Sequence, residues 1–283
     1  MRRFLAFPIV RLVLIVLLFG ALSTPLVLAT RGQHSEWASA AQSWALLAAL
    51  LLSTVVVERF TVRKSLAAIG FGPGKAVRDF ALGAAVGAAL FSIVVLELTI
   101  GGHYRILEAH FTPDLAMAAL LLLPGAAIEE LLFRGLLFRL IEEWSGTWIA
   151  LAVSAALFGL VHAANPGATW VSTLAIALEA GVLLGAAYVV ARNLWFPIGL
   201  HFAWNFAEGP IYGAQVSGHT FGTSAVAAQF SGPTLLTGGA FGPEAGLGAM
   251  LTCLVAAVAL LIVAVRRSQV MPADWKMSRM LKQ

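Results

Sequence analysis

The segment IEELLFRG, residues 128–135, places three ionisable side chains inside one of the most apolar parts of the chain. Glu130 and Arg134 are four residues apart, so on a helix they share one face and can form an ion pair. Glu129 is turned by about 100° from Glu130 and lacks this partner. A charge at the centre of a membrane helix costs roughly 2.5–3.5 kcal/mol and usually faces the protein interior. A packing ion pair alone would explain Glu130 and Arg134 but would leave Glu129 as an extra cost.

Two further polar pairs occur at helical spacing. FGLVH places Phe158 and His162 on one face of a helix, and HFAWN places His201 and Asn205 on one face of another. Each histidine taken singly is more often a packing residue than a functional one. With a helical rise of about 1.5 Å per residue, however, Glu129 and both histidines fall in the cytoplasmic half of the membrane or near its middle. Polar groups at similar depth on three helices are best satisfied around a wet cavity.

The residue types in this set favour hydrolysis by water. A carboxylate and an imidazole can hold and deprotonate a water molecule. A second imidazole and an amide can donate hydrogen bonds to an oxygen that becomes negative in a tetrahedral intermediate. A GxSxG motif is absent, and Cys253 is isolated in the last apolar segment. One glutamate and two histidines could ligate zinc, but the HExxH spacing is missing, so no cofactor is predicted.

Composition indicates the elements that must position these groups. Hydrophobic residues make up 60% of 283 positions, charged residues 11%, and the mean hydropathy is +0.88. A soluble chain carries about 45–50% apolar and about 25% charged residues. We predict an all-α polytopic membrane bundle, one integral membrane domain over residues 1–283, with its motif-bearing core at about 115–209. Because a span needs about 20 apolar residues, eight are expected, at about 7–29, 37–57, 80–100, 115–139, 147–165, 171–191, 195–209 and 246–265.

The basic residues predict the orientation of these eight spans. Most Lys and Arg fall on one side, whereas the opposite loops hold only Arg31 and Arg105. This bias predicts that both termini are cytoplasmic. The net charge of +4 then reflects topology and anionic lipid headgroups, so the lipid bilayer is an expected partner and nucleic acid is not. The first apolar segment could instead be a cleaved signal peptide, which would leave the other spans unchanged.

The three motifs carry a family resemblance. EELLFR, FGLVH and HFAWN resemble, in order, the EExxxR, FxxxH and HxxxN/D motifs of the CPBP family of intramembrane proteases, which includes the CAAX prenyl proteases. The residues marked by the resemblance are Glu129, Glu130, Arg134, His162, His201 and Asn205. It implies that the first glutamate and the first histidine activate the attacking water, with no metal. It further implies that the second glutamate and the arginine support them, while the second histidine and the asparagine bind the oxyanion.

Function and substrate are predicted only as classes. Short loops and an Ala-, Leu-, Gly- and Arg-rich composition look prokaryotic, so a peptide, a propeptide or a membrane-protein tail is expected as substrate in a prokaryotic cell membrane. A non-catalytic scaffold or bacteriocin-immunity-type protein is the alternative. A proton-coupled transporter also uses intramembrane Glu, His and Arg, but the chain shows no inverted repeat. The oligomeric state is not predicted.

Other polar residues receive ordinary interpretations. Glu97 and Glu179 are expected near helix ends or in internal hydrogen bonds, with a place in the lining of the cavity as the alternative, and His219 is expected to be solvated in an outer loop. Trp204 lies between the two polar residues of the third motif and could wall the site. The Gly-rich segment from Gly213 to Gly246 could form a capping or re-entrant loop.

Overall fold

A computed structural model describes residues 2–33, 35–109, 115–220 and 224–273 of the chain. Its N-terminal half contains α1 (Arg2–Leu5), α2 (Pro8–Ala29), α3 (Glu36–Thr61), η1 (Ala67–Ile69), η2 (Pro73–Lys75) and α4 (Ala76–Ile100). The motif-bearing part contains α5 (Leu115–Glu130), η3 (Leu131–Phe138), α6 (Arg139–Ser145), α7 (Thr147–His162), α8 (Trp170–Ile176), η4 (Ala177–Gly181), α9 (Val182–Ala191), α10 (Trp195–Phe206) and η5 (Ala207–Ile211). The chain closes with α11 (Thr234–Thr237), η6 (Pro243–Ala245) and α12 (Leu247–Arg266).

Long apolar helices confirm the predicted class of a helical integral membrane protein. Within the described residues, six helices are long and apolar enough to cross a membrane, namely Pro8–Ala29, Glu36–Thr61, Pro73–Ile100, Leu115–Ser145, Trp170–Ala191 and Leu247–Arg266. The other two expected spans, at about 147–165 and 195–209, correspond to α7 with 16 residues and α10 with 12 residues. Both are shorter than the roughly 20 residues that a full span requires. The predicted number of eight spans is therefore not confirmed.

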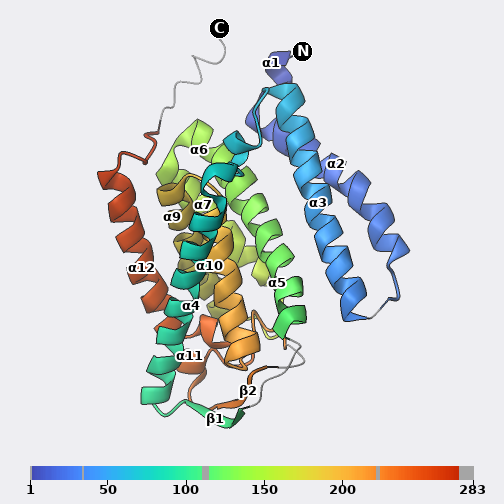
Figure 1. Cartoon of the computed structure of the whole chain (residues 1–283). Coiled ribbons are helices and arrows are strands. Elements are labelled where there is room, and N and C mark those ends of the chain that lie inside the picture. The colour runs from blue at the N-terminus through green and yellow to red at the C-terminus, as the bar shows by residue number, and fades with distance from the viewer. Residues whose placement is uncertain (1, 34, 110–114, 221–223, 274–283) are drawn as a thin grey trace.

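Two ends of the molecule can be distinguished (Figure 1). The end at which α2 begins and α12 finishes is called the terminal end below. The opposite end is called the β end, because it carries the antiparallel pair β1 (Tyr104–Ala109) and β2 (Val226–Phe230). Sequence patterning did not predict this strand pair, in which Tyr104 lies opposite Phe230. The pairing ties the connection after α4 to the Gly-rich segment before α12.

Close packing of α4 against α10 positions the central helix of the site. A Cβ atom built on Gly83 would lie 2.1 Å from the carbonyl oxygen of Phe196, and one on Gly87 would lie 2.2 Å from that of Leu200. Only glycine permits backbones this close. Gly87 lies near the middle of α4, so the neighbouring His201 sits at mid-depth in the bundle.

A network of buried ion pairs joins α2, α3 and α6 near the terminal end. Arg11 bonds to Glu58 at 2.7 Å and to Glu143 at 2.9 Å, and Arg139 bonds to Glu58 at 2.8 Å. Lys64 also pairs with Glu143. Arg11 and Glu58 are almost completely buried. We refer to these five residues as the terminal ion cluster.

Candidate active site

The acidic pair lies where α5 changes its helical form. Glu129 and Glu130 are the last residues of α5, and the following segment, Leu131–Phe138, is π-helical. π-helical turns are rare and often occur at functional sites, because the extra residue redirects the side chains of that turn. Arg134 lies within this segment and is fully buried with Glu130.

Arg134 holds Glu130 as the sequence spacing predicts. Its Nη1 donates to Glu130 Oε1 at 3.0 Å, and its Nη2 donates to the carbonyl oxygens of Ala180 and Gly181 at 3.2 and 3.0 Å. The guanidinium carbon also lies 4.5 Å from the ring centroid of Phe158. Charge, backbone acceptors and an aromatic face therefore fix this cation between α5, α7 and η4.

The same carboxylate reaches α10. His201 Nδ1 lies 3.0 Å from Glu130 Oε1, so with an ionised Glu130 this nitrogen carries the proton and donates it. Glu130 therefore links Arg134 to His201. The ion pair expected from the spacing of Glu130 and Arg134 is present. Beyond Arg134, the described hydrogen-bond partner of Glu130 is His201.

Glu129 faces the two histidines without bonding to either. Its Oε2 lies 3.8 Å from His162 Nε2 and 3.9 Å from His201 Nε2. This oxygen is buried and finds no hydrogen-bond partner among the described residues, although the side chain as a whole is 36% exposed. Such separations are too long for a direct hydrogen bond and suit a bridging water. All three residues border the larger cavity described below, so a small polar molecule bound there could contact each of them.

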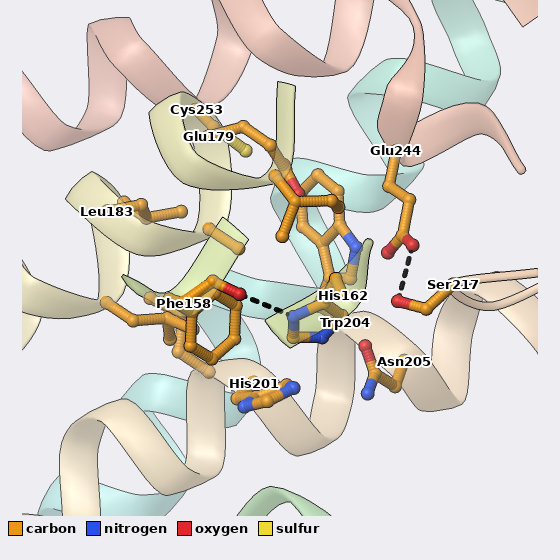
Figure 2. A pocket seen from close by; sticks show the side chains of 14 residues that line it. Phe158, His162, Glu179, Leu183, His201, Trp204, Asn205, Ser217, Glu244 and Cys253 are labelled. Atoms are coloured by element: carbon orange, nitrogen blue, oxygen red, sulfur yellow. Dashed lines mark hydrogen bonds between the residues drawn. The ribbon is translucent and has the colours of Figure 1, made fainter. Parts of the chain in front are cut away.

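The tautomer of His162 is set by its own helix. Its Nδ1 lies 2.7 Å from the carbonyl oxygen of Phe158, which can only accept, so Nδ1 donates (Figure 2). The neutral ring then presents the Nε2 lone pair toward Glu129. The i, i+4 spacing of Phe158 and His162 thus serves to orient the imidazole as well as to pack it.

Two cavities adjoin this site. The larger has a volume of about 510 Å³ and lies between α5, the end of α7, α10 and the loop after η5; Glu129, His162, His201 and Asn205 line it. The smaller, of about 20 Å³, has room for roughly one water molecule. Figure 2 shows Glu179 and Cys253 on one side of this small cavity, and His201 and Asn205 on the other. Trp204 also lines it, in agreement with the prediction that this residue could wall the site.

Four of the six predicted site residues thus line the larger cavity, and the other two lie directly behind them. Glu130 and Arg134 are fully buried, and Glu130 contacts His201. The structure therefore brings together residues that are separated by up to 76 positions in the chain.

Sequence reasoning missed several polar residues at this site. Ser217 Oγ donates to Glu244 Oε1 at 2.6 Å, and both residues line the small cavity. Burial raises the pKa of Glu244, although the hydrogen bond from Ser217 and the nearby His162 oppose this effect. His219 was interpreted as an ordinary solvated residue; it is exposed, but it also lines the larger cavity.

Two buried glutamates extend the polar region away from the motifs. Glu179 lines the small cavity, which is the alternative to its expected place near a helix end or in an internal hydrogen bond, and its Oε1 has no partner in the described part of the chain. Glu208 is fully buried, and neither of its oxygens has a partner within the same residues. Glu208 follows His201 by seven positions, a helical repeat that could have revealed it. Glu97, in contrast, accepts a hydrogen bond from Thr252 at 3.0 Å, as expected.

The described residues do not suggest an obvious metal centre. No group of three or more His, Cys, Asp or Glu side chains within them is arranged so that it could hold a metal ion.

Comparison with known families agrees with the motifs. Residues 111–207 match the family described as type II CAAX prenyl endopeptidase Rce1-like. This range contains all six predicted site residues, whereas Glu208, Ser217 and Glu244 lie beyond it. No curated protein matches the chain. The family suggests an intramembrane endopeptidase, which implies a peptide or protein substrate. Over residues 111–207, therefore, the chain is similar to the Rce1-like CAAX prenyl endopeptidases, the resemblance that its three motifs predict.

Proposed function

We propose that the protein is an intramembrane endopeptidase in which Glu129 and His162 activate a water molecule to attack a peptide bond. The observation that carries the proposal is the position of Glu129 Oε2, which is buried without a partner and lies 3.8 and 3.9 Å from two imidazole nitrogens. A buried polar atom without a partner is costly, so such atoms tend to be retained where function needs them. The family match over residues 111–207 supports this reaction class.

The proposed reaction begins with the bound water. Its oxygen attacks the carbonyl carbon while Glu129 takes one proton, with the lone pair of His162 Nε2 as the second acceptor that orients the water. The C–N bond then breaks, and the proton held by Glu129 passes to the leaving nitrogen. The products are a carboxylic acid and an amine; the acid then passes its proton to the amine, which leaves a carboxylate and an ammonium group, so no other reactant is needed.

His201 and Asn205 would stabilise the negative oxygen of the tetrahedral intermediate. His201 Nδ1–H is directed to Glu130, so its Nε2 can donate a hydrogen bond only when the ring is protonated. The negative charge of Glu130 favours that form, and Arg134 fixes the carboxylate in place. The supporting pair would therefore act on the oxyanion site by orienting His201. We propose a peptide, a propeptide or a membrane-protein segment in a prokaryotic membrane as substrate.

A proton-coupled transporter is the second candidate. The observation that favours it is the set of three buried acids, Glu179, Glu208 and Glu244, because intramembrane carboxyl groups also serve as proton relays. Solute uptake into proteoliposomes that depends on a pH gradient and is lost in Glu208→Gln would support this candidate over the protease.

The test of proteolysis compares new peptide termini in membranes from cells that express wild type or Glu129→Ala. Glu36→Ala is the control, because Glu36 is an exposed acid in the first turn of α3 that lines neither cavity. Equal expression and equal thermal stability of the three proteins are checked first. We expect a set of fragments that vanishes in Glu129→Ala alone. Identical termini in all three membranes would contradict the proposal.

A further inference from the structure

The larger cavity extends from the site toward the β end. On α5, which starts near that end, Leu121, Leu122, Gly125 and Ala126 line it before Glu129 does. These positions follow successive turns of one helix face. On the other elements it is lined by Leu132 and Phe133 of η3, by His201 and Asn205 of α10, by the last turn of α7 and the turn that follows it, and by the segment 216–219. Of these, Asn165 and the segment 216–219 follow the ends of α7 and η5 and lie on the β-end side of the site.

The terminal end of the site, in contrast, is closed by packed side chains. Immediately beyond Glu129, residues Glu130, Leu131, Arg134, Leu136 and Phe138 are all fully buried. The terminal ion cluster lies farther in the same direction and ties α2 and α3 to α6. A polypeptide segment approaching from that end would have to displace this buried core, and protein interiors are close-packed.

The short helix α7 leaves the site accessible from the other side. Its 16 residues rise by about 24 Å, whereas the hydrocarbon core of a bilayer is about 30 Å thick. If α7 starts at the terminal-end surface, its last residue, His162, ends below the opposite surface. The polar side chains of Asn165, Ser217 and His219 line the cavity at this level. Polar backbone and side chains at such a depth are tolerated where they line a water-filled space.

The cavity wall offers space for a side chain beside the reaction site. A Cβ atom built on Gly125, one turn before Glu129, meets no described atom within 4 Å. Leu121, Leu122 and Val161 provide apolar walls around this space, and Val161 is 52% exposed. The cavity therefore combines a polar end with an apolar flank. This suits a segment that leaves a membrane helix and enters water.

We infer that substrates reach the site from the β end, and that they are membrane-anchored polypeptides cleaved in the segment that emerges on this side. Because the basic residues predict a cytoplasmic terminal end, the cleaved segment lies on the extracytoplasmic side. The substrate class rests on the proposed function, whereas the direction of access rests on the cavity alone.

Cysteine labelling tests the direction of access without a known substrate. In a Cys253→Ser background, Gly125→Cys and Lys75→Cys are treated with a membrane-impermeant, charged maleimide in intact cells and in inverted vesicles. Lys75 is exposed at the terminal end and reports that side. Gly20→Cys is the matched control, because a Cβ at Gly20 in α2 also meets no described atom within 4 Å but lies outside the cavity, where a thiol in lipid should not react.

We expect Gly125→Cys to be labelled in intact cells, Lys75→Cys only in inverted vesicles, and Gly20→Cys in neither. Labelling of Gly125→Cys only in inverted vesicles, or in neither preparation, would overturn the inference. The Glu129-dependent fragments provide the second test, since their new termini should map to extracytoplasmic segments next to spanning helices; termini in cytoplasmic segments would overturn it. Failure of proteolysis itself would show as unchanged termini, and the labelling result would stand apart from it.

Discussion

In the terminal ion cluster, both oxygens of Glu58 accept hydrogen bonds from Arg11, and Oε1 also accepts one from Arg139. At the candidate active site, Arg134 bonds to one oxygen of Glu130, whose Oε2 has no described partner, and Glu129 Oε2 faces two imidazoles at distances beyond hydrogen bonding. Both regions place acidic groups among apolar helices. They differ in hydrogen bonding. Both oxygens of Glu58 have partners within the protein, whereas at the candidate active site a buried carboxylate oxygen has none among the described residues.

This difference separates a structural cluster from a reactive one. A buried acid whose oxygens are bonded to arginine is held in one place, and removing one partner leaves an uncompensated charge. A carboxylate oxygen that is buried without a partner is available to a bound molecule, and such groups concentrate at functional sites. Substitutions in the two regions should therefore separate activity from stability.

The largest effect on activity is expected for Glu129→Gln. The amide keeps the size of the side chain but removes the proton acceptor, so kcat should fall by about 10²–10⁴-fold, the usual contribution of a general base. The melting temperature should stay at the wild-type value, because Oε2 has no described partner to lose. Cleavage rates and thermal unfolding in the same detergent measure both quantities. An unfolded or fully active variant would contradict the comparison.

The opposite pattern is expected for Glu58→Gln. The substitution removes the charge that Arg11 and Arg139 share, and breaking a buried ion pair typically costs about 3–5 kcal/mol. The melting temperature should fall markedly, while the folded fraction should keep the wild-type kcat. Thermal unfolding and activity per folded molecule test this. A normal melting temperature together with lost activity would show that the terminal ion cluster belongs to the reactive region.

The local parts of this site could be predicted from sequence, because helical spacing determines which side chains share a face. The Glu130–Arg134 pair and the neighbouring positions of His201 and Asn205 follow from i, i+4 spacing alone. The proximity of Glu129 to both histidines, which lie on different helices, was inferred from similar depth and from family motifs, and the structure shows it.

Other parts depend on contacts between distant segments, which spacing does not reveal. Ser217 reaches Glu244 because the loop after η5 folds back beneath the helices, and the strand pair joins residues about 120 positions apart. The number of spans also resists prediction, since the hydropathy of α7 does not show that this helix ends at His162. Glu208, in contrast to these features, could have been found from sequence spacing, because it follows His201 by seven residues.

A smaller effect on activity is expected for Asn205→Ala. Removing one donor from an oxyanion site lowers kcat by about 10²–10³-fold, and KM should change little if the amide acts mainly in the transition state. Asn165→Ala is the matched control, since Asn165 is an amide that lines the same cavity but belongs to none of the three motifs. This control should alter KM more than kcat. Equal effects of the two substitutions on kcat would argue against a special role for Asn205.

The smallest effect, a change in melting temperature that depends on pH, is expected for Glu244→Gln. Glu244 is a third kind of buried acid. Glu244 accepts a hydrogen bond from Ser217 and faces His162, with two further acids, Glu179 and Glu208, nearby; within the described residues no Arg or Lys pairs with it. Burial raises the pKa of Glu244 above its unfolded value of about 4.3.

The sign of the pH effect follows from this direction. Because folding favours the protonated form, the stability of the wild type is highest below the unfolded pKa and falls as pH rises toward the folded pKa. Glutamine stays neutral and can still accept the hydrogen bond from Ser217, so Glu244→Gln should escape this loss. At pH 8 the variant should melt higher than wild type by roughly 2–4 °C for each 1 kcal/mol gained, and the difference should shrink toward pH 4. A difference that does not change with pH would mean that Glu244 does not titrate between the folded and unfolded states, and it would place this acid with the fully compensated groups of the terminal ion cluster.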